Sequence, residues 1–236
     1  MKKTLALFAL ITLFNTAAPI HAESSPVSTT FTTAYESRYV LYGYRLSRHL
    51  YMADIYLFKP LDENTSIWGG VWYGYLTDGT YQEVDVYGGI DRMITDTLTL
   101  GLAYSLFNYI EVPFPTSDHV SEFAAHATYA SGGLSLQLRE QYDTEADGHL
   151  VRAIGSYTLP LADSVSLVLG AEAGYAFNYF IDGNLWNHAE VSAKTPWQLN
   201  DQWSISPFIA RSIPLAAIDD FEEYETYGGI SASYTF

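Results

Sequence analysis

The chain ends on Tyr227-Gly-Gly-Ile-Ser-Ala-Ser-Tyr-Thr-Phe236, a stretch that alternates apolar and small polar residues. Successive side chains of a β-strand point to opposite faces, so Ile230, Ala232, Tyr234 and Phe236 share one face and the serines share the other. One face suits lipid and the other suits water. The stretch therefore predicts the closing strand of a membrane β-barrel.

The same period-two alternation recurs upstream, in segments bounded by turn residues. The segment from 164 to 179 is longer than most strands of soluble sheets and suits a tilted membrane crossing. Together the segments predict an all-β fold, an antiparallel transmembrane β-barrel of about 12 strands, within a range of about 10 to 14. The expected strands are 29–43, 49–59, 65–77, 80–92, 96–110, 119–131, 133–143, 149–160, 164–179, 185–196, 202–212 and 223–236.

The N-terminus has the layout of a secretory signal peptide. Lys2 and Lys3 precede an apolar run from Leu5 to Phe14, and small residues follow up to Ala22. We expect residues 1–22 to be a cleaved signal peptide, 23–28 a flexible lead-in, and 29–236 a single barrel domain. The chain has no cysteine, so neither a disulfide nor a lipoprotein anchor is expected.

Composition narrows the class of protein further. The chain carries 27 acidic against 11 basic residues, which argues against a nucleic-acid partner. Past Ala22 no apolar run is long enough for a spanning helix, so insertion in lipid requires a closed barrel. The 20 tyrosines, 12 phenylalanines and five tryptophans suit interfacial girdles. A secreted β-sandwich would show similar local alternation, but the long strands and the aromatics near strand ends favour the barrel.

Connections between the segments alternate between short and long. Ser131–Gly133 is one of the short ones, whereas 111–118 and 213–222 are the longest. Outer-membrane barrels have short periplasmic turns and longer extracellular loops. We therefore expect the long connections on the extracellular side and both ends of the barrel domain on the periplasmic side.

Almost every charge within a strand falls on the face opposite the apolar one. A charge facing the bilayer centre costs roughly 2–4 kcal/mol, so the charged face is expected to line the lumen. Acidic residues outnumber basic ones there, which predicts a mild preference for cations if the lumen conducts. The expected lumen-facing residues are Glu36, Arg38, Asp54, Glu83, Asp85, Asp91, Glu122, His126, Arg139, Arg152, Glu172, His188, Glu190, Lys194 and Glu225.

Two roles remain open for this set. The residues could line an aqueous pore, or they could pair with one another and fill the barrel. Barrels of about eight strands are filled by side chains and those of 16 or more hold a channel, so 12 strands do not decide between the two.

Enzymatic chemistry has little support in the sequence, so we expect no catalytic residues, no cofactor and no metal site. The weaker alternative is an outer-membrane hydrolase that uses Ser117, Asp118 and His119, which are adjacent in one expected loop.

The segment Ser37-Arg-Tyr-Val-Leu-Tyr-Gly-Tyr-Arg-Leu-Ser47 resembles the N-terminal signature of the Gcw_chp (TorF-like) family of outer-membrane barrels, Ser-x-Tyr-Val-Phe-Arg-Gly. The serine, tyrosine, valine and glycine match, whereas Leu41 and Tyr42 replace Phe-Arg. Further similarity lies within 67–72 and 83–89, so the resemblance covers 37–89. It implies an outer-membrane barrel and no site residues, since the family has no established activity.

Taken together, the sequence predicts a passive, porin-like channel for small solutes in the outer membrane of a Gram-negative cell. A plugged structural or receptor barrel is the main alternative. The expected partners are outer-membrane lipid and the barrel-assembly machinery, which would engage the C-terminal strand ending in Phe236. The sequence leaves the oligomeric state open.

Overall fold

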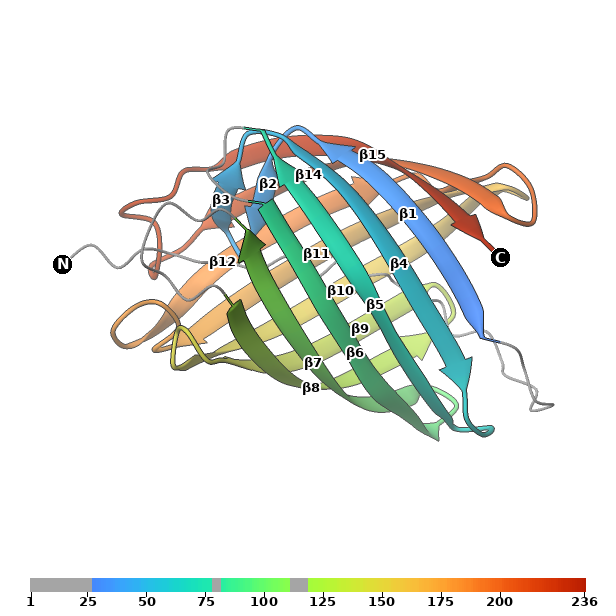
Figure 1. The fold of residues 1–236 in the computed structure, drawn as a ribbon, viewed down its shortest axis with the longest axis horizontal. Helices are drawn as coiled ribbons and strands as arrows, with labels where there is room; N and C mark the ends of the chain where they lie inside the picture. Colours follow the sequence, from blue (N-terminus) through green and yellow to red (C-terminus); the bar gives the residue numbers. More distant parts are fainter. Residues whose placement is uncertain (1–26, 78–81, 111–118) are drawn as a thin grey trace.

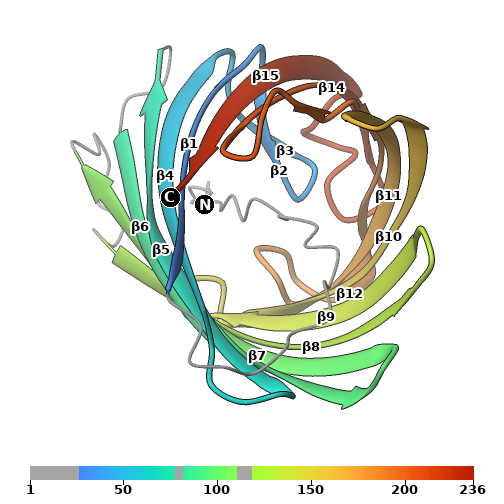
Figure 2. The ribbon, with the colours of Figure 1, turned by 90° about the vertical axis from the view of Figure 1, so that its right-hand side faces the viewer.

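The protein was analysed as a computed structural model that describes residues 27–77, 82–110 and 119–236. Twelve strands form one closed antiparallel barrel (Figures 1 and 2). The wall strands, in order around the barrel, are β1 (Ser28–Glu36), β4 (Leu50–Pro60), β5 (Thr65–Leu76), β6 (Gln82–Thr95), β7 (Leu98–Ile110), β8 (His119–Ser131), β9 (Leu134–Asp143), β10 (Gly148–Ala162), β11 (Val165–Phe177), β12 (Asn184–Lys194), β14 (Trp203–Pro214) and β15 (Glu225–Thr235). A two-residue strand, β13 (Trp197–Gln198), continues the wall between β11 and β14.

The first and last strands close the barrel. β1 pairs with β15 from Thr30 opposite Thr235 to Glu36 opposite Gly229. On the inner side, the Thr32 and Ser233 hydroxyls lie 2.9 Å apart across this seam. Closure pairs the backbone groups of both edges, which a wall in lipid requires.

The wall is apolar outside and polar inside. Neighbouring residues on β4 show the contrast: the Ile55 side chain is 48% exposed on the outer face, whereas Asp54 is 2% exposed inside. Among the described residues, no helix is long and apolar enough to cross a bilayer.

Aromatic side chains gather on the outer surface near both rims. Tyr51, Tyr75 and Trp186 lie near one end of their strands, and Trp203 and Tyr234 lie near the other. Trp203 and Tyr234 pack with ring centroids 4.9 Å apart. Two such belts are the interfacial girdles of a membrane barrel.

The two ends of the barrel differ in their connections. At one end, here called the turn end, β1 begins and β15 ends, and short turns join the strands (Figure 1). At the other, the loop end, residues 37–49, 178–183 and 215–224 make longer connections. This arrangement follows the predicted alternation of short and long connections.

The prediction of a first strand over 29–43 is wrong. β1 ends at Glu36, and the chain then forms a separate hairpin of β2 (Tyr39–Leu41) and β3 (Tyr44–Ser47). This hairpin projects from the wall into the barrel interior (Figure 2). Each of the other expected segments corresponds to one wall strand, with ends displaced by no more than about three residues. The expected signal peptide, 1–22, lies outside the described residues, as does most of the lead-in.

Candidate functional site

The inserted hairpin turns on two residues with left-handed backbone. Tyr42 has φ 49° and Gly43 has φ 88°, and Leu41 pairs with Tyr44 on either side. Positive φ at both central residues is the type I′ turn that suits a two-residue hairpin. This conformation is uncommon for a bulky residue, so contacts around Tyr42 must hold it there.

Those contacts come from the barrel wall. The Asn187 Nδ2 amide donates to the Tyr42 carbonyl oxygen at 2.6 Å, and the Arg152 guanidinium lies 4.5 Å from the centroid of the Tyr42 ring. The Tyr179 ring meets the Tyr42 ring edge-on, with centroids 6.5 Å apart. The hairpin tip is thus held by a hydrogen bond, a cation–π contact and an aromatic contact.

Apolar packing fixes the body of the hairpin. Tyr39 packs against Trp72 of β5, with ring centroids 6.0 Å apart, and Tyr44 stacks on Phe221 of the β14–β15 connection at 6.1 Å. Ile218 of that connection is fully buried with them. Burial of each such side chain contributes on the order of 1.5–3 kcal/mol, so this packing stabilises the hairpin inside the loop end of the barrel.

Beneath the hairpin, a chain of polar contacts crosses the inner wall from β8 to β12. Its six members are all buried or nearly so. In order, Arg139 pairs with Glu122 at 3.2 Å, Gln141 donates to Glu122 at 2.8 Å, Arg152 donates to Gln141 at 3.1 Å and to Glu172 at 3.0 Å, and His188 Nε2 lies 3.1 Å from Glu172. Each buried charge in this chain has an opposite charge as partner, which offsets its desolvation.

Two acidic residues elsewhere on the inner wall lack this compensation. Glu83 and Asp85 of β6 are 0% and 1% exposed, and the Tyr39 hydroxyl donates to Glu83 at 3.5 Å. Among the residues that the structure describes, neither carboxyl forms an ion pair with a basic group. These two buried carboxyls lie close to the hairpin, at the loop end of the barrel.

The turn-end half of the lumen is more open. Its inward residues are mostly serines and threonines, such as Ser135, Ser192 and Ser204, and they are partly exposed to solvent. Asp91 accepts a hydrogen bond from the Trp68 indole at 3.1 Å and lies 3.1 Å from His126 Nε2. Among the described residues, the inward side chains at the loop end are thus mostly buried around the hairpin, whereas those at the turn end are partly exposed.

The remaining predicted residues have the following surroundings. Asp54 accepts the Tyr87 hydroxyl at 2.7 Å, and Glu190 accepts the Tyr227 hydroxyl at 2.6 Å. Glu36 and Lys194 lie partly buried on β1 and β12. The placement of Arg38 within a strand is wrong: it follows the end of β1, half-exposed at the rim, where it and Arg45 reach Glu225 at 3.5 and 2.7 Å.

Several residues of the site were not anticipated. The hairpin tip and Asn187 are the most important of these. The Tyr42-Gly43 pair carries a turn signal in the sequence, whereas nothing local marks Asn187. Outside the wall strands, burial raises the pKa of Glu222, which accepts the Arg45 backbone amide at 3.1 Å.

The alternative catalytic site has no described geometry. Ser117 and Asp118 lie outside the described residues, and His119 is exposed at the start of β8. In the described ranges, no group of three or more His, Cys, Asp or Glu side chains is arranged to hold a metal ion.

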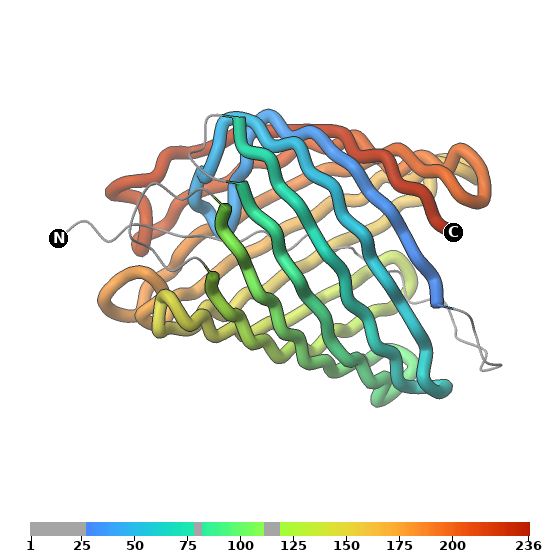
Figure 3. The backbone as a smooth tube through the Cα atoms, in the orientation of Figure 1, coloured from blue at the N-terminus to red at the C-terminus, as the bar shows by residue number. Residues whose placement is uncertain are grey.

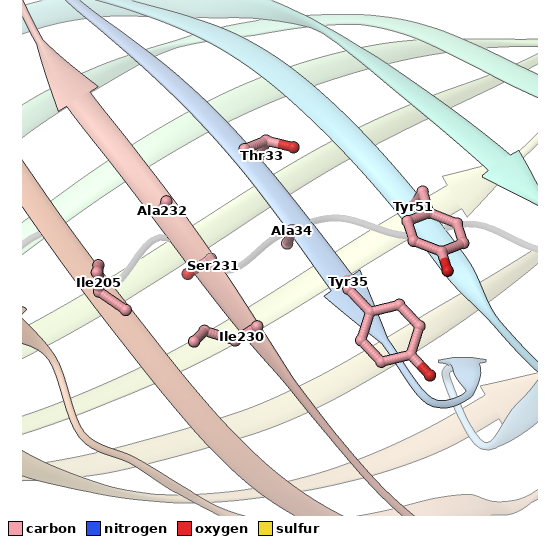
Figure 4. Close-up of a pocket in the computed structure, with 8 residues that line it drawn as sticks. All are labelled: Thr33, Ala34, Tyr35, Tyr51, Ile205, Ile230, Ser231 and Ala232. Carbon is pink, nitrogen blue, oxygen red and sulfur yellow. The ribbon is translucent and has the colours of Figure 1, made fainter.

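A shallow groove of about 310 Å³ lies on the outer wall across the β1–β15 seam (Figure 4). Tyr35, Tyr51, Ile205 and Ile230 border it, and the small residue Ala232 lies between them. The side chains of Tyr35, Tyr51, Ile205 and Ile230 belong to the outer face, so the groove opens on that face. Figure 3 shows the tilt of the strands that form the wall.

Comparison with known proteins identifies the fold of the chain but assigns it to no family. No family model matches the chain, and no curated protein matches it. The resemblance to the Gcw_chp family therefore stays a prediction.

Solved outer-membrane porins and channels share the architecture. An outer-membrane channel from Pseudomonas putida F1 aligns with a TM-score of 0.58 and 10% identity, over 93% of this chain and all of that one. KdgM porin, in complex with disordered oligogalacturonate, aligns at 0.56 and 10% identity, over 89% and 99% of the two chains. NanC porin aligns at 0.56 and 11% identity, over 87% and 98%. At such identities the likeness establishes the fold of an outer-membrane barrel and leaves the solute open.

Proposed function

We propose that the protein is a porin-like outer-membrane channel for small solutes, and that the β2–β3 hairpin is its gate. The shared architecture of solved porins and channels supports the location and the general class. The observation that carries the proposal is the contrast between the two halves of the lumen. The inward residues of the turn-end half are polar and partly exposed, whereas the loop-end half holds the hairpin, a segment that is not part of the wall.

The hairpin is suited to leaving the lumen. Its strands pair only with each other, so its release breaks side-chain contacts, the Asn187 bond and the bond from the Arg45 amide to Glu222, but no wall ladder. The wall strands on either side stay in register, because Glu36 of β1 and Leu50 of β4 are directly paired. Loops that fold into a lumen can therefore move without unfolding the barrel.

The pathway would favour cations. Glu83 and Asp85 lie directly below the hairpin without basic partners among the described residues, and Asp54 and Asp91 continue the acidic lining. Carboxylates along a water-filled path replace part of a cation's hydration and repel anions. The same lining would disfavour acidic solutes.

A permanently plugged barrel is the second candidate. The contact chain from Glu122 to His188 spans five adjacent strands and supports it, because such networks can fill a small barrel without a mobile loop. In that case, removing the hairpin would open no path.

Replacing residues 37–49 by a two-residue Asn-Gly turn separates the two candidates. Glu36 and Leu50 are cross-strand partners, so a tight turn can join β1 to β4 in register. The control replaces residues 144–147 by the same turn, since Asp143 and Gly148 are likewise partners. Single-channel recordings in planar bilayers then compare both with the unmodified protein.

The channel proposal predicts long-lived, cation-selective steps for the 37–49 replacement, with brief or rare openings for the control and the unmodified protein. Silent bilayers for the 37–49 replacement, although it has inserted and folded, would favour the plugged barrel. Equal conductance for all three proteins would show that the hairpin is not the gate.

A further inference from the structure

We propose that Asn187 and His188 form a proton-sensitive latch that releases the hairpin when the medium is acidified. This inference rests on the proposed role of the hairpin as a gate. It is carried by the juxtaposition of the Asn187 amide, the His188 ring and the Tyr42 carbonyl at the hairpin tip.

A β-bulge in β12 creates this juxtaposition. Gly174 pairs with His188 and Tyr175 pairs with Trp186, so Asn187 is an extra residue in the ladder. Two consecutive side chains, Asn187 and His188, therefore both lie inside the barrel, at 0% and 2% exposure. Bulges re-aim side chains in this way and are frequent beside functional sites.

The hydrogen-bond partners determine which atoms carry hydrogen. A backbone carbonyl only accepts, so the Asn187 atom 2.6 Å from the Tyr42 oxygen must be the amide nitrogen. The same nitrogen lies 3.0 Å from His188 Nδ1, which must therefore accept. The single proton of a neutral His188 ring is then on Nε2, where it faces Glu172 at 3.1 Å.

A second proton would have to enter on Nδ1, facing the Asn187 NH₂ group, which is also a donor. Turning the amide over would bring its oxygen against the Tyr42 carbonyl, so either response breaks the bond to the hairpin. The ring has little room to move away on the side of β11, because it packs against Gly174, where an ideal Cβ would lie 2.6 Å from the His188 Cε1 and 2.7 Å from its Nδ1.

The other groups around His188 do not reverse this effect. Glu172 on β11 faces Nε2 of the ring and also pairs with Arg152 on β10, so it does not contact Nδ1. Glu190 lies two residues along β12 and accepts the Tyr227 hydroxyl. The Tyr42 and Tyr179 rings complete the surroundings and remain neutral at the pH values concerned. A proton added to Nδ1 would therefore face the NH₂ group of Asn187 and break the bond to the hairpin.

Thiol labelling can test the latch without relying on conductance. The natural chain has no cysteine, so Leu41→Cys places one thiol in the buried part of the hairpin. Its labelling rate with a hydrophilic maleimide, in the refolded full-length protein, is divided by that of Asp220→Cys in an exposed loop. This ratio corrects for the effect of pH on the reaction between a thiol and the maleimide. The expected result is a rise of roughly 5- to 150-fold from pH 7.5 to pH 5, corresponding to loss of one buried hydrogen bond.

Variants of the latch give the controls. In the Leu41→Cys background, His188→Asn keeps an acceptor near the Nδ1 position but cannot titrate, so the pH response should vanish while the hairpin stays protected. Asn187→Ala should label fast at both pH values. His126→Asn alters a histidine that contacts Asp91 and not the hairpin, so the response should persist.

A pH response that survives His188→Asn, or slower labelling at pH 5, would overturn the latch. Labelling that follows the latch prediction while bilayers stay silent would support the latch and refute the channel. Bilayer openings that come with pH-independent labelling would refute the latch and leave the channel standing.

Discussion

Gly43 at the hairpin tip offers a sharp perturbation, Gly43→Ala. At φ 88° a Cβ costs about 1–2 kcal/mol of backbone strain. That Cβ would lie 2.7 Å from Ile218 Cδ1 and 2.6 Å from His188 Cβ. The isoleucine methyl can rotate away, but the His188 Cβ is fixed to the wall, so the hairpin must shift. Such overpacking costs about 1–3 kcal/mol more.

The total of about 2–5 kcal/mol acts on hairpin docking and leaves the wall ladder intact. At 1.4 kcal/mol per tenfold change, the population of released hairpin should rise by roughly 30-fold to a few thousand-fold. The assay is maleimide labelling of Leu41→Cys at neutral pH, with and without Gly43→Ala.

Gly132→Ala is the matched control. Gly132 also has positive φ, 59°, but nothing lies within 4 Å of its ideal Cβ position. It belongs to a turn at the opposite end of the barrel, so it carries backbone strain without any collision at the hairpin. Labelling should stay at the parent rate. A less than threefold rise for Gly43→Ala, or an equal rise for both variants, would refute the reasoning.

Three further changes probe the wall and the network. Arg152→Ala leaves Glu172 without its guanidinium partner and should lower the free energy of unfolding in urea by about 3–5 kcal/mol. Adding Glu172→Ala should recover part of that stability. A loss below about 1 kcal/mol for Arg152→Ala would contradict the pairing. Ile55→Arg puts a charge on the outer wall near mid-height and should cost about 2–4 kcal/mol in vesicles, whereas an unchanged stability would argue against lipid contact there. Removal of Phe236 should lower the amount of barrel in the outer membrane severalfold while leaving refolding in detergent unchanged, and normal membrane levels would dismiss a role in assembly.

The sequence predicted the wall strands because lipid on one side and water on the other impose a strict two-residue period. That period also places Glu83 and Asp85 on the side of their strands where the structure buries them, and Glu172 on the inner face, where its side chain is 16% exposed. The turn residues between segments then set the boundaries of most strands to within a few residues.

The hairpin escaped prediction because its alternation continues that of β1. Tyr39 and Leu41 keep the phase of Tyr35, and a strand inserted in a lumen has the same local pattern as one in the wall. The sign of a turn was present in Tyr42-Gly43, but only long-range contacts with Trp72, Arg152 and Asn187 decide where the hairpin lies.

The latch residue Asn187 was beyond the reach of a periodic argument. An extra residue in β12 changes the phase of the alternation, and the bulge is defined by pairing with β11. The partners within the network depend likewise on how neighbouring strands are staggered. Local sequence therefore indicates which residues face inward but not which of them meet.

The most direct test of the account is to label the hairpin while the channel is being recorded. With Leu41→Cys in a planar bilayer, maleimide should react at a rate that rises with the open probability, and each modified channel should then stay open because the labelled hairpin no longer fits the lumen. Openings that persist while the introduced thiol stays unreactive would show that ions pass with the hairpin in place, contrary to its role as the gate.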